Sequence, residues 1–263
     1  MDEIKSTKQF ITLTTDWGQH DYYCGVLKGS VYSACPNVQI VDLSHDIPSY
    51  NINNAAFIVK HSYNSFPEGT IHLILVNSDS IQFSKILAFK HNEHIFIVPD
   101  NGIIGLLFSK PPESIYAIEN EILGSFTSVN LFAQALKDLY DGKELESIGK
   151  KVDEYEKRIA LRPTIDESVI SGSIIYIDSY KNAITNISRS LFDRIGQNRA
   201  YNIFVQSNHN KVNLLSNNYN EVDSGELLAL FNSANLLEIA IRNGFASELL
   251  NLQIGGTVRV NFG

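Results

Sequence analysis

The first half of the chain alternates between two hydrophobic patterns. Short, nearly continuous apolar runs predict strands, and runs in which apolar residues recur every three or four positions predict helices. The predicted strands are residues 10–15, 38–43, 71–76, 86–89 and 95–98, and the predicted helices are residues 21–32, 51–63, a short helix ending at 108, and 130–140. Strands that alternate with helices in this way predict an α/β domain with a central, largely parallel sheet.

The pattern changes after residue 150. Residues 151–166 carry a dense run of charges that is typical of a connection between domains, although a solvated surface segment has the same composition. Beyond it, short apolar runs separated by turn residues predict strands at 169–178, 183–187, 201–206, 227–231, 236–241 and 257–262, the pattern of a small β-barrel or sandwich. We therefore expect an N-terminal α/β domain (1–150), a linker (151–166) and a smaller C-terminal β-barrel domain (167–263).

Composition narrows the class of protein. A chain of 263 residues with a formal net charge of -8 does not have the clustered Lys and Arg of a nucleic-acid surface, so a small ligand or a protein partner is expected. No apolar run approaches the length of a membrane span, and the polar N-terminus is unlike a signal peptide, so a cytoplasmic location with no membrane contact is expected. Cys24 and Cys35 have no metal or disulfide spacing and are interpreted as buried apolar residues.

Polar residues follow several predicted strands. They are Asp16, Asp21, His45, residues 77–80, Asp100, Asn101, Asp178, Tyr180 and Asn182. Because ligands of open α/β sheets bind at the carboxyl ends of the strands, these residues together outline a polar crevice of nucleoside size. Each alone is also typical of a turn, and for Asp16 alone the favoured interpretation is a cap of the next helix.

Nothing in the chain has the spacing of a common cofactor motif. Dinucleotide, P-loop and hydrolase-elbow motifs are absent from the sequence. Asp42, His45 and Asp46 are the best candidates for a metal, but their spacing favours capping and turn roles, so no metal is expected.

Ordered blocks of sequence carry a more specific signal. The blocks are Thr15-Asp16-Trp17-Gly18 with Asp21-Tyr22-Tyr23 and Lys28-Gly29, Ile40-Val41-Asp42-Leu43-Ser44-His45, Ala55-Ala56, Phe66-Pro67-Glu68-Gly69-Thr70-Ile71-His72, Pro99-Asp100-Asn101-Gly102, Asp178-Ser179-Tyr180-Lys181-Asn182, Thr185-Asn186-Ile187, Asn232-Ser233 and Leu237-Glu238-Ile239-Ala240. Together they resemble the S-adenosyl-L-methionine (SAM) hydroxide adenosyltransferase family, which also contains the SAM-dependent fluorinase and chlorinase. They run in order from about residue 10 to the C-terminus.

The resemblance implies an activity, an assembly and a set of ligand contacts. The implied reaction displaces methionine from the 5′ carbon of SAM by hydroxide or halide without metal or cofactor, in a homotrimer whose sites lie between neighbouring subunits. A sulfonium is already a good leaving group, so the protein has to align the nucleophile and remove its water. The implied contacts are Asp16 to the ribose hydroxyls, Tyr50 along the ligand, Asp21 and Asp178 to the methionine ammonium, Tyr180 and Asn182 to the nucleoside, and Ser233 to the methionine carboxylate.

The residues expected at the nucleophile depart from the family. Hydroxide-using members have an Asp, an Arg and a His there, and this chain has Asn77, Ser84 and Thr127. Neither Asn nor an ordinary Thr acts as a base near neutral pH. Asp79 is a substitute carboxylate or a turn acceptor, and Lys85 is interpreted as a solvated surface residue, with a cationic role at the site as the alternative.

Two small hydroxyls leave a halide reaction open. Ser128 matches the serine that serves the halide in the fluorinase, and Ser80 falls on its threonine position, although coincidence is the favoured explanation. Three hypotheses follow: a SAM-cleaving enzyme that forms adenosine and methionine, an enzyme that uses a halide or other small anion, and a catalytically silent binder of SAM or adenosine. The first is our prediction.

Overall fold

The computed structural model describes residues 9–78, 85–119 and 127–263, and the side chains of residues 127 and 128 lie outside the described part. The chain divides into two compact units, Met1–Ile159 and Ala160–Gly263. Among the described residues, the helices are too short or too polar to span a bilayer.

The first unit contains a mixed seven-stranded sheet with the order β2-β1-β3-β5-β4-β6-β7. The strands are β1 (Gln9–Thr15), β2 (Val38–Ser44), β3 (Ile71–Leu75), β4 (Lys85–His91), β5 (His94–Pro99), β6 (Ile115–Glu119) and β7 (Lys150–Lys151). Neighbours among β2, β1, β3 and β5 pair in parallel, whereas β4 pairs antiparallel with β5 and β6, and β6 pairs antiparallel with β7.

The prediction of a largely parallel sheet is therefore right for only half of the strand pairs. The reason is a tight hairpin between β4 and β5, in which His91 pairs with His94 across Asn92 and Glu93. Both turn residues have positive φ, 47° and 60°, as two-residue hairpin turns commonly require. A connection this short forces antiparallel pairing.

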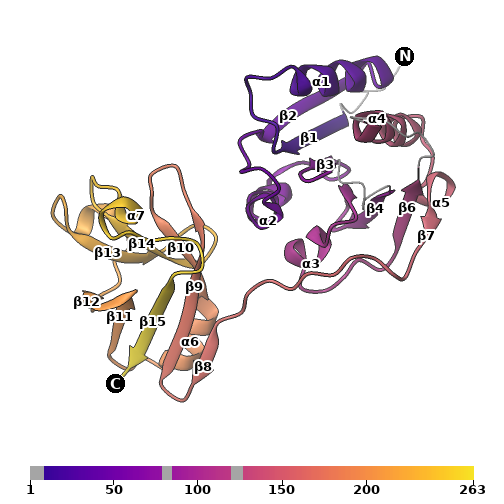
Figure 1. The fold of residues 1–263 in the computed structure, drawn as a ribbon. Coiled ribbons are helices and arrows are strands. Elements are labelled where there is room, and N and C mark those ends of the chain that lie inside the picture. Colours follow the sequence, from indigo (N-terminus) through magenta and orange to yellow (C-terminus); the bar gives the residue numbers. More distant parts are fainter. Residues whose placement is uncertain (1–8, 79–84, 120–126) are drawn as a thin grey trace, which may run out of the picture. The chain divides into compact units, whose positions relative to one another are not determined.

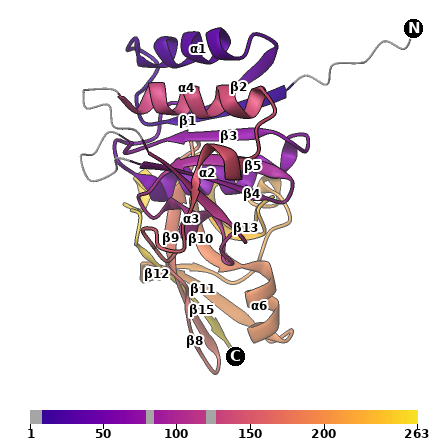
Figure 2. The same cartoon turned by 90° about the vertical axis from the view of Figure 1, so that its right-hand side faces the viewer.

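Helices cover both faces of this sheet. They are α1 (Tyr23–Ala34), α2 (Ile52–Ser62) followed by the 3-10 turn η1 (Tyr63–Ser65), α3 (Ile103–Leu107), α4 (Thr127–Tyr140) and α5 (Leu145–Ile148). Helices α1 and α4 pack on one face and α2 and α3 on the other, as Figures 1 and 2 show. Strand β3 divides its residues between the two cores, with Leu73 and Leu75 toward α1 and Ile74, followed by Val76 just after the strand, toward α2.

This arrangement creates a topological switch point beside β1. The connection through α1 leads from β1 to β2 on one face, and the connection through α2 leads from β2 back past β1 to β3 on the other face. The carboxyl ends of the four parallel strands meet at one edge, and Asp16, His45, Asn77 and Asp100 follow them there. Open α/β sheets bind ligands at such an edge.

The second unit is a nearly closed, barrel-like antiparallel sheet with the order β12-β11-β15-β9-β10-β14-β13, and β8 pairs with β9 (Figure 1). Its strands are β8 (Thr164–Asp166), β9 (Val169–Ile177), β10 (Ala183–Ser188), β11 (Tyr201–Val205), β12 (Ser207–Val212), β13 (Leu227–Phe231), β14 (Leu236–Ile241) and β15 (Thr257–Phe262). It also contains α6 (Arg189–Gly196), η2 (Tyr219–Glu221) and α7 (Ala246–Leu249). An isolated bridge from Leu215 to Ala229 links the two ends of the strand order.

The periodicity predicts most elements to within about two residues, but it misses several short ones. The sequence prediction omits α5, α6, α7, η1, η2, β6, β7 and β8. Helix α6 is short and strongly polar on one side, and its first turn is held by Ser188, whose hydroxyl accepts the N–H of Leu191 at 3.2 Å. A Ser N-cap before a short amphipathic segment is the signal that would have predicted it.

Candidate functional site

Asp16 is the point at which three segments of the first unit converge. The side chain follows β1, and its Oδ2 accepts the backbone N–H of Tyr50 at 2.8 Å and that of Asn77 at 3.2 Å. Tyr50 precedes α2, and Asn77 follows β3. The structure therefore joins three of the predicted site residues at the switch point of the sheet.

Asp16 is not the cap of helix α1. The N-cap of α1 is Tyr22, whose side chain makes no capping hydrogen bond. The interpretation of Asp16 as a helix cap is therefore wrong. Its carboxylate accepts the backbone N–H groups of Tyr50 and Asn77, which lie elsewhere along the edge of the sheet, instead of N–H groups of the next helix.

Tyr50 and Asn77 have unusual backbone conformations. Their φ angles are 65° and 51°, in the left-handed region that non-glycine residues seldom adopt. Such a conformation costs a Tyr on the order of 1–2 kcal/mol, and Asn somewhat less. The hydrogen bonds to the Asp16 carboxylate offset part of this cost, since charge-assisted hydrogen bonds are stronger than neutral ones. The Tyr50 side chain is 74% exposed.

His45 belongs to a polar chain beside Asp16. Its Nδ1 lies 2.9 Å from Thr15 Oγ1, and its Nε2 lies 3.1 Å from Asp42 Oδ1. Asp42 Oδ2 also accepts a hydrogen bond from Lys28 Nζ at 2.6 Å. Burial works to raise the pKa of Asp42, but Lys28 and His45 outweigh it, and the pKa lies below its ordinary value.

The three candidate metal ligands, Asp42, His45 and Asp46, have hydrogen-bond or ion-pair partners within the protein. Asp42 and His45 are partners of one another, and Asp46 is exposed, with its N–H donating to Ser44 Oγ at 3.1 Å. Within the part of the chain that the structure describes, His, Cys, Asp and Glu side chains form no group of three or more suited to a metal ion. The hydrogen bond from Asp46 to Ser44 fits the turn role that the spacing favoured, whereas the pairing of Asp42 with His45 was not predicted.

Lys85 forms an ion pair with a buried carboxylate at the same edge. Lys85 Nζ lies 2.9 Å from Asp100 Oδ2, and the two side chains are 31% and 8% exposed. Asp100 Oδ1 accepts the N–H of Glu156 at 2.8 Å, so it also holds the chain segment that leaves the unit. The interpretation of Lys85 as a solvated surface residue is wrong, because its position at the start of β4 places it beside the end of β5.

The other predicted nucleophile-site residues are described only in part. Ser80, Ser84 and the alternative Asp79 lie outside the described residues. Thr127 and Ser128 begin helix α4, and their side chains are outside the described part as well. The proposed loss of the Asp, Arg and His groups therefore stays a prediction. Asp21 is exposed, just before α1.

In the second unit, Asp178 and Asn182 close one turn between β9 and β10. Asp178 Oδ1 accepts the backbone N–H of Asn182 at 2.8 Å, and Oδ2 lies 3.3 Å from Asn182 Nδ2. Tyr180 projects from this turn and is 76% exposed. The turn thus presents an aromatic ring next to a carboxylate whose orientation is fixed by Asn182.

Ser233 lies on a different turn, the one between β13 and β14. Along β10, Ala183 pairs with Ile239 and Ser188 pairs with Leu236, so the two turns stand at opposite ends of this strand. The structure does not place Ser233 next to Asp178. Between them lies Glu238, a buried acidic residue in an apolar strand, which the sequence analysis did not single out as a site residue. A charged residue at a core-like position was the available signal.

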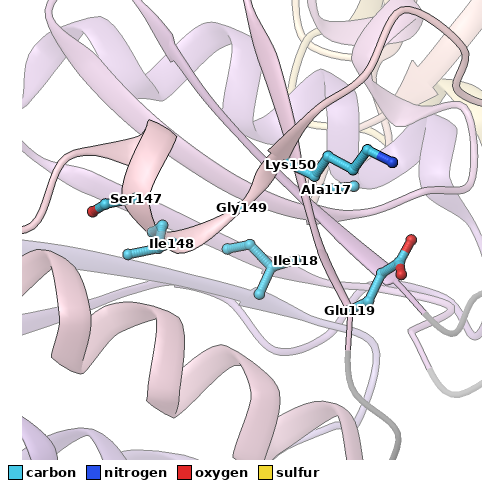
Figure 3. A pocket seen from close by; sticks show the side chains of 7 residues that line it. All are labelled: Ala117, Ile118, Glu119, Ser147, Ile148, Gly149 and Lys150. Carbon is cyan, nitrogen blue, oxygen red and sulfur yellow. The ribbon is translucent and has the colours of Figure 1, made fainter.

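A separate pocket in the first unit contains none of the predicted site residues. It has a volume of about 360 Å³ and is lined by Ala117, Ile118, Glu119, Ser147, Ile148, Gly149 and Lys150. Figure 3 shows the aliphatic side chains of Ile118 and Ile148 on one side and the charged groups of Glu119 and Lys150 on the other. Without a converging set of polar groups, this pocket is a weaker ligand site than the Asp16 edge.

Comparison with known proteins gives a consistent result over both units. Residues 11–149 match the profile of the SAM hydroxide adenosyltransferase N-terminal domain, and residues 172–259 match that of its C-terminal domain. The chain is 26% identical to a protein of Thermus thermophilus named (R)-S-adenosyl-L-methionine hydrolase, over 94% of this chain and 97% of that one. It is 22% identical to a fluorinase of Nocardia brasiliensis, with both chains fully covered.

Solved structures are similar over nearly the whole chain. A crystal structure of an uncharacterized conserved protein from Thermotoga maritima has a TM-score of 0.85 at 26% identity, covering 95% of this chain and 99% of that one. A conserved hypothetical protein from Thermus thermophilus has a TM-score of 0.76 at 26% identity, covering 96% and 99%.

Proposed function

The chain belongs to the SAM hydroxide adenosyltransferase family, and from this premise we propose that it cleaves SAM by transferring the adenosyl group to water or hydroxide. The products are adenosine and methionine. The single observation that carries the proposal is the Asp16 carboxylate, held at 2.8 and 3.2 Å by two backbone N–H groups at the switch point of the sheet. A carboxylate fixed in this way has lone pairs left to accept both ribose hydroxyls.

The proposed reaction is a single displacement. The oxygen of water or hydroxide forms a bond to the 5′ carbon, the bond from that carbon to sulfur breaks, and its electron pair neutralises the sulfonium to leave methionine. When water attacks, one proton is released. Because the leaving group is already activated, alignment and desolvation of the nucleophile are the main tasks of the protein.

The remaining ligand contacts follow the family resemblance. The resemblance assigns Asp21 and Asp178 to the methionine ammonium and Ser233 to its carboxylate. Because the Asp178 and Ser233 turns stand at opposite ends of β10, these contacts require the amino acid to lie over the surface between the two turns. Tyr50 lies along the ligand, and Tyr180 and Asn182 line the nucleoside. Tyr50 and Tyr180 are 74% and 76% exposed, so both rings are accessible to a ligand.

The assembly is part of the proposal. The Asp16 group and the Asp178 group belong to different units of the chain, and the family resemblance assigns them to neighbouring protomers of a homotrimer. Light scattering on a sizing column tests this. A mass of three chains is expected, and a strict monomer would contradict the shared site.

A silent binder of SAM or adenosine is the second candidate. One observation favours it: the residue that the resemblance places at the position of the family's Asp is Asn77, and the contact of Asn77 with Asp16 runs through its backbone N–H. Its neutral side chain is not a base. The halide reaction of Ser80 and Ser128 is the remaining alternative.

One experiment separates these candidates. Purified protein is incubated with SAM in chloride and in chloride-free buffer, and the products are identified by mass spectrometry. Adenosine and methionine in both buffers support the proposal, and a 5′-chloro product that requires chloride supports the halide reaction. A thermal shift with SAM but no product supports the binder. If the incubation gives no product and SAM causes no thermal shift, the SAM assignment is wrong.

A further inference from the structure

Glu238 is a buried carboxylate at the centre of a small network in the second unit. It lies in β14 and is 3% exposed. Tyr219 Oη donates to Glu238 Oε1 at 2.6 Å, and Asn232 Nδ2 donates to Glu238 Oε2 at 3.1 Å. Both partners are neutral donors. Burying a carboxylate is costly, and one with neutral partners calls for a role beyond packing.

Glu238 faces away from the core of the barrel. Its neighbours Leu237 and Ile239 belong to that core, whereas the opposite face carries a small cluster of Leu228, Leu230 and Ala240 with Val222 packed against it. The loop between β12 and β13 supplies Val222 and Tyr219, so it covers this outer face. Glu238 therefore lies between the sheet and the loop.

The Asn232 side chain connects Glu238 to the turn that carries Ser233. While Nδ2 donates to Glu238, Oδ1 accepts the N–H of Ala234 at 3.0 Å and that of Leu236 at 3.2 Å. The oxygen of the Asn232 amide thus closes the turn, and its nitrogen attaches the turn to Glu238. Ser233 lies inside this closed turn and is exposed.

Tyr219 brings the same network close to the other turn. Burial raises the pKa of Tyr219, its hydrogen bond to Glu238 and the charge of that carboxylate raise it further, and Asp178 makes the smallest contribution. In the sheet, Glu238 pairs with Ile184, and Ile184 pairs with Tyr176, two residues before Asp178. The network therefore occupies the surface between the two turns that carry Asp178 and Ser233.

We propose that Glu238 is a positioning residue that, through Asn232 and Tyr219, holds the Ser233 turn in the conformation that receives the amino-acid half of the ligand. The proposal rests on the proposed function, in which Asp178 and Ser233 meet the methionine part of SAM. Loss of the Glu238 network is therefore expected to weaken binding of ligands that carry the amino acid, such as SAM, and to leave the affinity for adenosine unchanged.

The test compares two ligands across matched variants. Asn232→Asp keeps the acceptor that closes the turn but places an oxygen against Glu238, and Tyr219→Phe removes only the hydroxyl donor. Both are expected to weaken SAM binding about 10- to 100-fold in calorimetry, the effect of losing a hydrogen bond to a charged group, with adenosine affinity unchanged within about twofold. Glu238→Gln is expected to retain affinity, because an amide can accept from Asn232 and donate to Tyr219.

Glu221→Gln is the control in the same loop, because Glu221 is an exposed acceptor for Asn217 and Asn218. It is expected to bind both ligands like the unmodified chain. Equal weakening of SAM and adenosine together with a lower melting temperature would reduce Glu238 to a structural role and overturn the proposal, as would unchanged SAM binding in all variants. If the unmodified chain binds neither ligand, the proposed function fails and this inference fails with it.

Discussion

The backbone N–H of Asn77 and the Oδ2 of Asp16 lie 3.2 Å apart, across the switch point between β3 and β1. The N–H of Tyr50 reaches the same oxygen at 2.8 Å. One oxygen of Asp16 is therefore used to fix the geometry of the site, and the proposed function uses the other for the ligand.

Replacing Asp16 by Asn is expected to weaken binding of both SAM and adenosine. The amide has one oxygen, so it cannot accept from the two backbone N–H groups and from the ribose hydroxyls together. The expected loss is about 10- to 100-fold in affinity, since hydrogen bonds to a charged acceptor contribute about 1.5–3 kcal/mol. Asp46→Asn, at an exposed position after β2, is the control in the same calorimetric titrations. Equal affinities for the two variants would contradict the assignment of Asp16.

Substitutions of Asn77 separate the role of its backbone N–H, which bonds Asp16, from any role of its amide side chain in the reaction. Its φ of 51° suits Gly, so Asn77→Gly is expected to retain the N–H bond to Asp16 and the ligand affinity. Asn77→Val is expected to lower the free energy of unfolding by about 1–2 kcal/mol, because a β-branched residue is strained at positive φ. Urea unfolding and SAM titration of both variants are the measurements. Product formation that disappears in Asn77→Gly at unchanged affinity would show that the amide side chain takes part in the chemistry.

The Lys85 and Asp100 pair is expected to stabilise the first unit. Lys85→Met leaves a buried carboxylate without its cation, and the pair is only partly exposed, so a loss of about 1–3 kcal/mol is expected. Adding Asp100→Asn to Lys85→Met should recover part of the lost free energy of unfolding, because the amide is neutral and can still accept from the N–H of Glu156. A double-mutant cycle of urea unfolding measures the coupling. Strict additivity of the two substitutions would mean that the pair contributes nothing.

Buried histidines predict acid sensitivity of the first unit. His72 Nδ1 lies 2.7 Å from Thr12 Oγ1, and Nε2 lies 3.1 Å from His94 Nδ1. Burial, with a smaller contribution from His94, lowers the pKa of His72 to about 3. In the unfolded chain this histidine binds a proton near pH 6.5, whereas in the folded chain it stays neutral down to about pH 3. The free energy of unfolding therefore falls as the pH drops from about 6.5 toward 3, by up to roughly 1.4 kcal/mol per pH unit.

Urea unfolding between pH 7 and 4 checks this pH dependence. His72→Asn can still reach Thr12 but does not titrate, so its stability at neutral pH is expected to fall while its pH slope becomes shallower. Asn replacement of the exposed His209 is the control and should leave the slope unchanged. The same slope in His72→Asn as in the unmodified chain would assign the acid sensitivity to other groups.

The sequence by itself determined most of the helices and strands and indicated the family, and the site residues that it named remain predictions. The 3.6-residue and two-residue periods of the apolar positions fixed most helices and strands, and ordered motifs from Asp16 to Glu238 indicated the family. Such local signals are strong because each element must bury one continuous apolar face. They do not encode partners that are distant in the chain.

Only the tertiary structure decided how those residues are used. Asp16 bonds residues 34 and 61 positions away, Lys85 pairs with Asp100 across a hairpin, and Glu238 joins Asn232 to Tyr219. The antiparallel pairing of β4 with β5 likewise follows from the two-residue turn at Asn92 and Glu93. The five residues between the predicted strands 86–89 and 95–98 were already too few for a parallel crossover. In each case backbone conformation and strand register bring the groups together, and neither quantity is visible in the identity of a single residue.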